Sequence, residues 1–167
     1  EVQITLLASN DDYCKKIDSL LGETIGNLLL DCGCSNTVCG SKWLELFMET
    51  LIDTEKDKIK TEETTAVYRF GDGRRMEAIK CVTIPCILAG KIVEIKTDVV
   101  DCNIPLLLSR SSMKKAGMVL NLIDDTAIVL GTKVRLGETS RGHYTLPISH
   151  PPSRSRIEHV LVNEVEH

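Results

Sequence analysis

The residues best suited to chemistry lie in one short stretch, where an aspartate ends an apolar run. Residues 28–30 are leucines, Asp31 follows them directly, and Cys32, Gly33 and Cys34 complete a turn. A buried strand would fix the carboxylate, and glycine would let a ligand approach the backbone closely. Because Asp-x-Gly turns are common, the motif alone indicates an ordinary turn more often than a catalytic group.

The cysteines suggest two rival chemistries. Cys32, Cys34 and Cys39 could hold a metal ion together with His143, and Cys39 could form a nucleophilic pair with His143. The spacing has no Cys-x-x-Cys clamp and no local signature of a Cys–His hydrolase, so we expect neither, and we expect no metal or other cofactor. The seven cysteines are odd in number and lie mostly in apolar stretches. That pattern is typical of free, buried thiols in a reducing compartment.

The composition excludes several classes of protein. Twenty Lys and Arg stand against 24 Asp and Glu, without basic blocks, so the surface has no general attraction for nucleic acid. A hydrophobic content of 43% is too high for a disordered chain. No apolar run approaches the roughly 20 residues of a membrane helix, and the amino terminus lacks a secretion signal. We therefore expect a folded cytoplasmic domain that binds neither nucleic acid nor membrane.

The elements that must position these residues are mostly strands. Hydrophobic patterning predicts strands at residues 2–8, 26–30, 67–69, 76–78, 82–87, 92–99, 104–109, 119–123, 126–130 and 133–136. An Asp-Gly pair between residues 67–69 and 76–78 predicts a hairpin, and the stretch lacks the Lys-Ser/Thr of a phosphate loop. Many short strands with few helices favour an all-β barrel or sandwich.

Two helices and two less regular segments complete the expected organisation. Residues 41–51 should form a helix capped by Ser41, and residues 110–116 a helix that ends at Gly117. Residues 11–21 are ambiguous, with one possible helical turn. Residues 150–155 read as a linker.

The order of these features resembles the retropepsin family, the aspartic proteases of retroviruses and LTR retrotransposons, and most closely the copia-like type. Asp31-Cys32-Gly33 after its apolar run is similar to the family's Asp-Thr/Ser-Gly element. Phe70-Gly71-Asp72-Gly73 stands where the family has its flap hairpin. Leu107-Leu108-Ser109-Arg110 matches the closing apolar-Gly-Arg element in all but the glycine. The similarity runs from about Gly22 to Leu122.

The resemblance implies an all-β closed barrel with one or two short helices, acting as a homodimer. Residues 22–148 would be the protease domain, residues 1–21 an amino-terminal extension, and residues 149–167 a linker or tail. Asp31 would be catalytic, one from each protomer, because the family needs two such loops and this chain has one. The substrate would be the Gag-Pol polyprotein, cut in the cytoplasm or inside virus-like particles.

The same resemblance assigns supporting roles. Val38 and the flap residues Phe70, Gly71, Asp72 and Gly73 would bind the peptide. Cys32, Gly33 and Cys34 would form the active-site loop. The structural residues near the site would be Leu107, Leu108, Ser109 and Arg110.

Three positions depart from the family pattern. Cys32 replaces a hydroxyl that braces the two catalytic loops, and a thiol is a weak donor. Ser35 stands where retroviral members have an Asp that pairs with the arginine, here Arg110. Ser109 replaces a glycine. A catalytically weak or inactive module of the same fold, serving in dimerisation or peptide binding, is therefore the alternative function.

Overall fold

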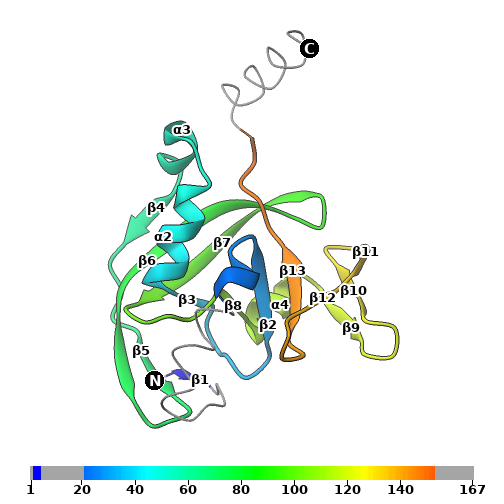
Figure 1. The fold of residues 1–167 in the computed structure, drawn as a ribbon, viewed down its shortest axis with the longest axis horizontal. Helices are drawn as coiled ribbons and strands as arrows, with labels where there is room; N and C mark the ends of the chain where they lie inside the picture. Colours follow the sequence, from blue (N-terminus) through cyan, green and yellow to red (C-terminus); the bar gives the residue numbers. More distant parts are fainter. Residues whose placement is uncertain (1, 5–20, 153–167) are drawn as a thin grey trace, which may run out of the picture.

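The computed structural model describes residues 2–4 and 21–152, which are mostly β-structure with few helices (Figure 1). A ten-stranded sheet and a separate three-stranded sheet make up most of the fold. The larger sheet contains β1 (Val2–Ile4), β2 (Asn27–Asp31), β3 (Val38–Gly40), β4 (Lys60–Glu62), β5 (Val67–Phe70), β6 (Arg75–Leu88), β7 (Lys91–Val100), β8 (Leu107–Ser109), β12 (Gly137–Glu138) and β13 (Tyr144–Pro147). The smaller sheet contains β9 (Val119–Asn121), β10 (Thr126–Val129) and β11 (Thr132–Arg135). The labelled helices are α2 (Ser41–Glu49), α3 (Asp53–Lys56) and α4 (Arg110–Lys115), and residues 21–24 are also helical.

The larger sheet is an open path. Its strand order is β1-β5-β6-β7-β3-β8-β2-β13-β12, with β4 paired to β6. Within the described residues the two ends of this path do not pair with each other, so the closed barrel implied by the resemblance is not seen. Closure needs the outermost strands to pair in matching register, and here they are β1, of three residues, and β12, of two.

The hairpins follow the turn residues in the sequence. β5 and β6 pair antiparallel around residues 71–74, with Gly73 at a φ of 87°. β6 then continues to Leu88, so the two strands predicted at 76–78 and 82–87 are one strand with a register shift between Ala78 and Lys80. The β6–β7 turn has positive φ at Ala89 and Gly90, which matches the twist of the flanking strands.

Helix α2 covers one side of the sheet and begins beside a tight backbone contact (Figure 1). The N-cap is Gly40, and the predicted cap Ser41 instead donates its hydroxyl to Asp101 Oδ1 at 3.1 Å. A Cβ on Gly40 would lie 2.1 Å from the Cys102 carbonyl oxygen, so only glycine fits where the chain enters the helix. The buried face of α2 carries Trp43, whose ring lies 5.1 Å from that of Phe47 in a stacked arrangement.

Some predicted elements are found where they were expected, and others differ in length or were not predicted. α4 and its stop at Gly117, with a φ of 59°, follow the prediction. The strand predicted at 104–109 is only β8, Leu107–Ser109. The amino-terminal strand is seen at residues 2–4, while its continuation and most of the ambiguous segment 11–21 lie outside the described residues. β3, β4, β12, β13 and α3 were not predicted.

Candidate active site

Two parallel strands position Asp31. β2 lies beside β8 in the interior of the sheet, in a register that places Leu29 beside Leu107 and Asp31 beside Ser109 (Figure 1). Leu28 and Leu29 are buried, which anchors β2 in the core. Because parallel strands end at the same edge of a sheet, the last residues of β2 and β8 meet there and the turns that follow lie together.

The turn after β2 holds the carboxylate through its own backbone. The Gly33 amide donates to Asp31 Oδ1 at 2.9 Å, and the Cys34 amide donates to the Asp31 carbonyl at 3.1 Å. A Cβ on Gly33 would lie 3.2 Å from Asp31 Oδ1, so a larger residue there would press on the carboxylate. Cys32 is exposed beside it.

Burial raises the pKa of Asp31. Loss of water around this partly buried carboxyl raises its pKa above the ordinary value, while the Gly33 hydrogen bond and the charge of His143 act in the opposite direction. The pairing of β13 with β2 explains the nearness of His143. Thr145 lies opposite Leu29, and His143 precedes β13 on the side where β2 continues to Asp31. In the sequence, His143 was a candidate only for the metal site and for the Cys–His pair, and not for the surroundings of Asp31.

A cluster of hydroxyls joins the Asp31 loop to β8 and α4. Thr37 Oγ1 accepts the Ser109 amide at 3.1 Å, donates to Ser109 Oγ at 3.2 Å and lies 3.0 Å from Ser112 Oγ. Ser109 caps α4 by accepting the Ser112 amide at 3.1 Å, and its hydroxyl also lies 3.0 Å from that of Ser111. We call Thr37, Ser109, Ser111 and Ser112 the hydroxyl cluster. The serine that replaces the family's glycine is thus part of the support of the loop.

Backbone contacts add to this support. The Arg110 amide donates to the Cys34 carbonyl at 3.0 Å, and the Ser111 hydroxyl donates to the Ser35 carbonyl at 3.1 Å. The exposed side chain of Arg110 makes no ion pair with the residues that the structure describes. The loop is therefore held without the aspartate–arginine pair of retroviral members.

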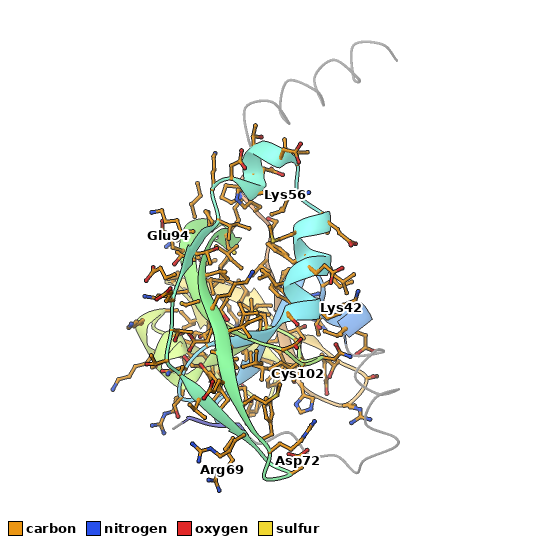
Figure 2. All side chains as sticks on the ribbon, turned by 90° about the vertical axis from the view of Figure 1, so that its left-hand side faces the viewer. Lys42, Lys56, Arg69, Asp72, Glu94 and Cys102 are labelled. Carbon is orange, nitrogen blue, oxygen red and sulfur yellow. The ribbon has the colours of Figure 1, made fainter. Side chains whose placement is uncertain are left out.

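The β5–β6 hairpin is fixed at its base and exposed at its tip. Tyr68 is fully buried and donates its hydroxyl to Asp98 Oδ2 at 2.5 Å, so the pKa of Tyr68 is raised by burial and by that carboxylate. Gly71, Asp72 and Gly73 are exposed at the tip, where Arg74 Nε lies 2.6 Å from Asp72 Oδ2. Figure 2 shows Asp72 and Arg69 at this end of the molecule. The role of the hairpin as a flap stays a prediction.

Other predicted site residues lie in the core. Val38 is fully buried in β3, opposite Leu107, and Phe70 packs in the same cluster. Leu108 lies in the other hydrophobic cluster. Their predicted roles in substrate binding or support stay predictions, since Val38 has no exposed surface in a single chain.

The thiols are dispersed. Cys39 packs in one hydrophobic cluster and Cys34 in the other, and burial raises the pKa of each thiol to about 12. Among residues 2–4 and 21–152, no three His, Cys, Asp or Glu side chains gather to hold a metal ion. In the same residues no helix is long and apolar enough to cross a membrane.

Two cavities lie near the site without including Asp31. The first, of about 480 Å³, is bounded by β7, α4 and the loop at Asn36 and Thr37. The second, of about 360 Å³, lies between α2 and the β6–β7 hairpin. Asp31, which is partly buried, lines neither of these two cavities in the single chain.

Comparisons with known proteins return a structural likeness but no match to a family model or a curated protein. Among solved structures, the chain is similar to the retroviral protease-like domain of Ddi1 from Leishmania major, with 16% sequence identity and a TM-score of 0.39, over 65% of this chain and 77% of that chain.

Proposed function

We propose that this chain is an aspartic endopeptidase domain that acts as a homodimer, with Asp31 of each protomer forming the catalytic pair. The sequence resemblance to copia-like retrotransposon proteases suggests the Gag-Pol polyprotein as substrate. Under this proposal the β5–β6 hairpin is the flap that covers the bound peptide, and the reaction takes place in the cytoplasm or in virus-like particles.

The observation that carries the proposal is the setting of Asp31. The carboxyl ends a buried strand, accepts the Gly33 amide at 2.9 Å and has a pKa raised by burial. Among residues 2–4 and 21–152, no second carboxylate is a cause of that pKa shift. Under this proposal the second carboxylate of the pair comes from another copy of the chain, related by a twofold axis beside Asp31.

The chemistry follows from two carboxyls about 3 Å apart, which share one proton because both cannot ionise together. The ionised Asp31 takes a proton from a bound water as the water oxygen bonds to the scissile carbonyl carbon. The protonated Asp31 of the partner donates a hydrogen bond to the carbonyl oxygen. The C–N bond of the tetrahedral intermediate then breaks, and a proton passes to the leaving amine.

Two observations favour the alternative, a module that binds or dimerises without cutting. Asp31 lines neither of the two cavities of the single chain, and its neighbour Cys32 is a thiol where the resembled family has a hydroxyl. In that case dimers form and no peptide bond is cleaved.

The deciding experiment mixes active and inactive chains. Wild-type protein is incubated with its polyprotein precursor at mildly acid pH, and Asp31→Asn protein is added at constant total concentration. If two protomers share the site, an equal mixture retains about one quarter of the activity, because only dimers with two aspartates cut. Retention of about half contradicts a shared site, and cleavage by Asp31→Asn alone removes Asp31 from the mechanism. Dimers in sedimentation without any cleavage support the module.

A further inference from the structure

Within the part of the chain that the structure describes, one side of strand β7 is unpaired over most of its length. β7 pairs with β6 from Lys91 to Val100, but on its other side β3 covers only Asp98 to Val100. Among residues 2–4 and 21–152, no strand lies beside residues 91–97 on that side. Such an edge presents backbone donors and acceptors to any extended chain that can reach it.

The direction of these backbone groups can be read from two neighbouring bonds. The Asp98 amide donates to the Thr37 carbonyl at 3.1 Å, so residue 98 points its backbone away from β6. Orientation alternates along a strand, and the β6–β7 register has no shift between residues 91 and 98. Ile92, Glu94 and Lys96 therefore also point their N–H and C=O groups to the open side. Pro85 lies opposite Glu94 and has no N–H, which agrees with Glu94 pointing its backbone groups away from β6.

The 480 Å³ cavity runs along this open edge. Val93, Glu94, Ile95 and Lys96 all line it, and consecutive residues of a strand can line one cavity only where it passes the strand edge. Its other walls are α4 and the loop at Thr37. The Thr37–Asp98 hydrogen bond stands at one end of the open strand edge, and at the other end Lys91 Nζ donates to the Leu130 carbonyl at 2.5 Å.

We propose that this groove binds a short extended peptide, which adds to β7 as a strand. Five residues at about 3.3 Å each fit the open edge from Ile92 to Lys96. Main-chain hydrogen bonds to residues 92, 94 and 96 hold the peptide, and alternate side chains enter the cavity. The site does not depend on the proposed protease activity, because Asp31 does not line it.

The lining defines the chemistry of the peptide. Apolar walls favour apolar side chains at the positions that face the cavity, and they are formed by Leu88, Val93, Ile95, Leu108, Ala116 and Leu130. Two of the charged lining residues are engaged: Lys96 Nζ lies 3.5 Å from Glu62 Oε2, and Asp98 accepts the Tyr68 hydroxyl. Lys115 makes no ion pair with the described residues, so an acidic side chain at one cavity-facing position complements it.

The probe is the peptide acetyl-Thr-Val-Thr-Val-Thr-Asp-Thr-amide, whose two valines and aspartate share one face of a strand. It is titrated into the full chain and followed by amide NMR and hydrogen exchange. We expect slower exchange at Ile92, Glu94 and Lys96, and little change at the odd-numbered residues that already pair with β6. A peptide with Lys in place of Asp should bind more weakly to the wild type and regain affinity for Lys115→Glu.

A matched pair of variants separates backbone from side chain. Glu94→Pro removes an N–H that β6 does not use, and an edge strand tolerates proline there, whereas Glu94→Ala keeps the N–H. We expect a roughly tenfold higher Kd for Glu94→Pro, from lost main-chain hydrogen bonds, and an unchanged Kd for Glu94→Ala. Figure 2 shows Glu94 at the opposite end of the molecule from Asp72, so the variant leaves the β5–β6 tip untouched.

Four results overturn the proposal. The first is no binding at millimolar peptide, and the second is equal binding by Glu94→Pro and Glu94→Ala. The third is self-association of the chain through this edge, lost in Glu94→Pro, which would make a second copy the occupant. The fourth is loss of peptide binding in Asp31→Asn, which would place the peptide at Asp31 instead. If the chain cleaves no substrate, the proposed protease function fails and the proposed peptide groove is not affected.

Discussion

Replacing Thr37 by valine tests the support of the Asp31 loop. Thr37 is 5% exposed, and its hydroxyl is the acceptor for the amide of fully buried Ser109. Valine has nearly the same shape but cannot accept that hydrogen bond. The hydroxyls of Ser109 and Ser112 keep each other as partners at 3.0 Å, so the main loss is one buried N–H without an acceptor.

An unsatisfied buried donor costs about 1–3 kcal/mol. We therefore expect Thr37→Val to lower the free energy of unfolding by about 2 kcal/mol. At roughly 2–4 °C per kcal/mol for a chain of this size, the Tm falls by about 4–8 °C. Urea unfolding at neutral pH, with a common m value for all variants, measures the difference.

Thr145→Val is the matched control. Thr145 is 7% exposed in β13, and its hydroxyl makes no hydrogen bond with the described residues. The same exchange of hydroxyl for methyl should change stability there by less than about 0.5 kcal/mol. Thr37→Ser, which keeps the acceptor, should fall between the two. Equal stability of Thr37→Val and Thr145→Val would show that the hydroxyl cluster does not hold the loop.

Three further predictions concern the carboxyl and its neighbours. Because burial raises the pKa of Asp31, the folded state favours its neutral form, and this contribution to stability is lost as pH rises through the raised pKa. We therefore expect Asp31→Asn to be more stable than the wild type at pH 7 and equally stable in acid, as measured by denaturation. Since the charge of His143 lowers the pKa of Asp31, His143→Gln should raise it, as followed by carboxyl carbon NMR, and an unchanged titration would remove His143 from the site. Cys32→Thr restores a hydroxyl beside Asp31 and should raise dimer stability in sedimentation and turnover in the cleavage assay; no gain in either would show that the thiol is not a defect.

Turns were predictable because their signals are local. Asp72-Gly73, Ala89-Gly90 and Asp124-Asp125 each stand between apolar strands, and the structure turns at all three. Helix α4 likewise ends where Gly117 allows a positive φ. In these cases the residue types and the backbone conformation are linked within a few positions.

Elements that depend on distant partners were not predictable in the same way. β3 has three residues, and it is a strand because β7 and β8 lie on its two sides. β13 was missed although it pairs with β2, and His143, whose charge acts on Asp31, directly precedes it. Thr37 and Ser109 are separated by 72 positions, and no spacing rule connects two hydroxyls that far apart. The sequence motif thus located Asp31, while the residues that support and tune it emerged only from the sheet.

Thr37 connects the two proposed sites through different atoms. Its carbonyl accepts the Asp98 amide and ends the open edge of β7, while its hydroxyl accepts the Ser109 amide and supports the loop of Asp31. A side-chain substitution at Thr37 alters the second contact and leaves the first available, because the carbonyl belongs to the backbone. A peptide on β7 would therefore end beside the residue that holds the Asp31 loop in place, without touching Asp31 itself. Ser109, Ser111 and Ser112 line the same groove and belong to the hydroxyl cluster, so occupancy of the groove and geometry of the carboxyl are linked through Thr37 and these serines.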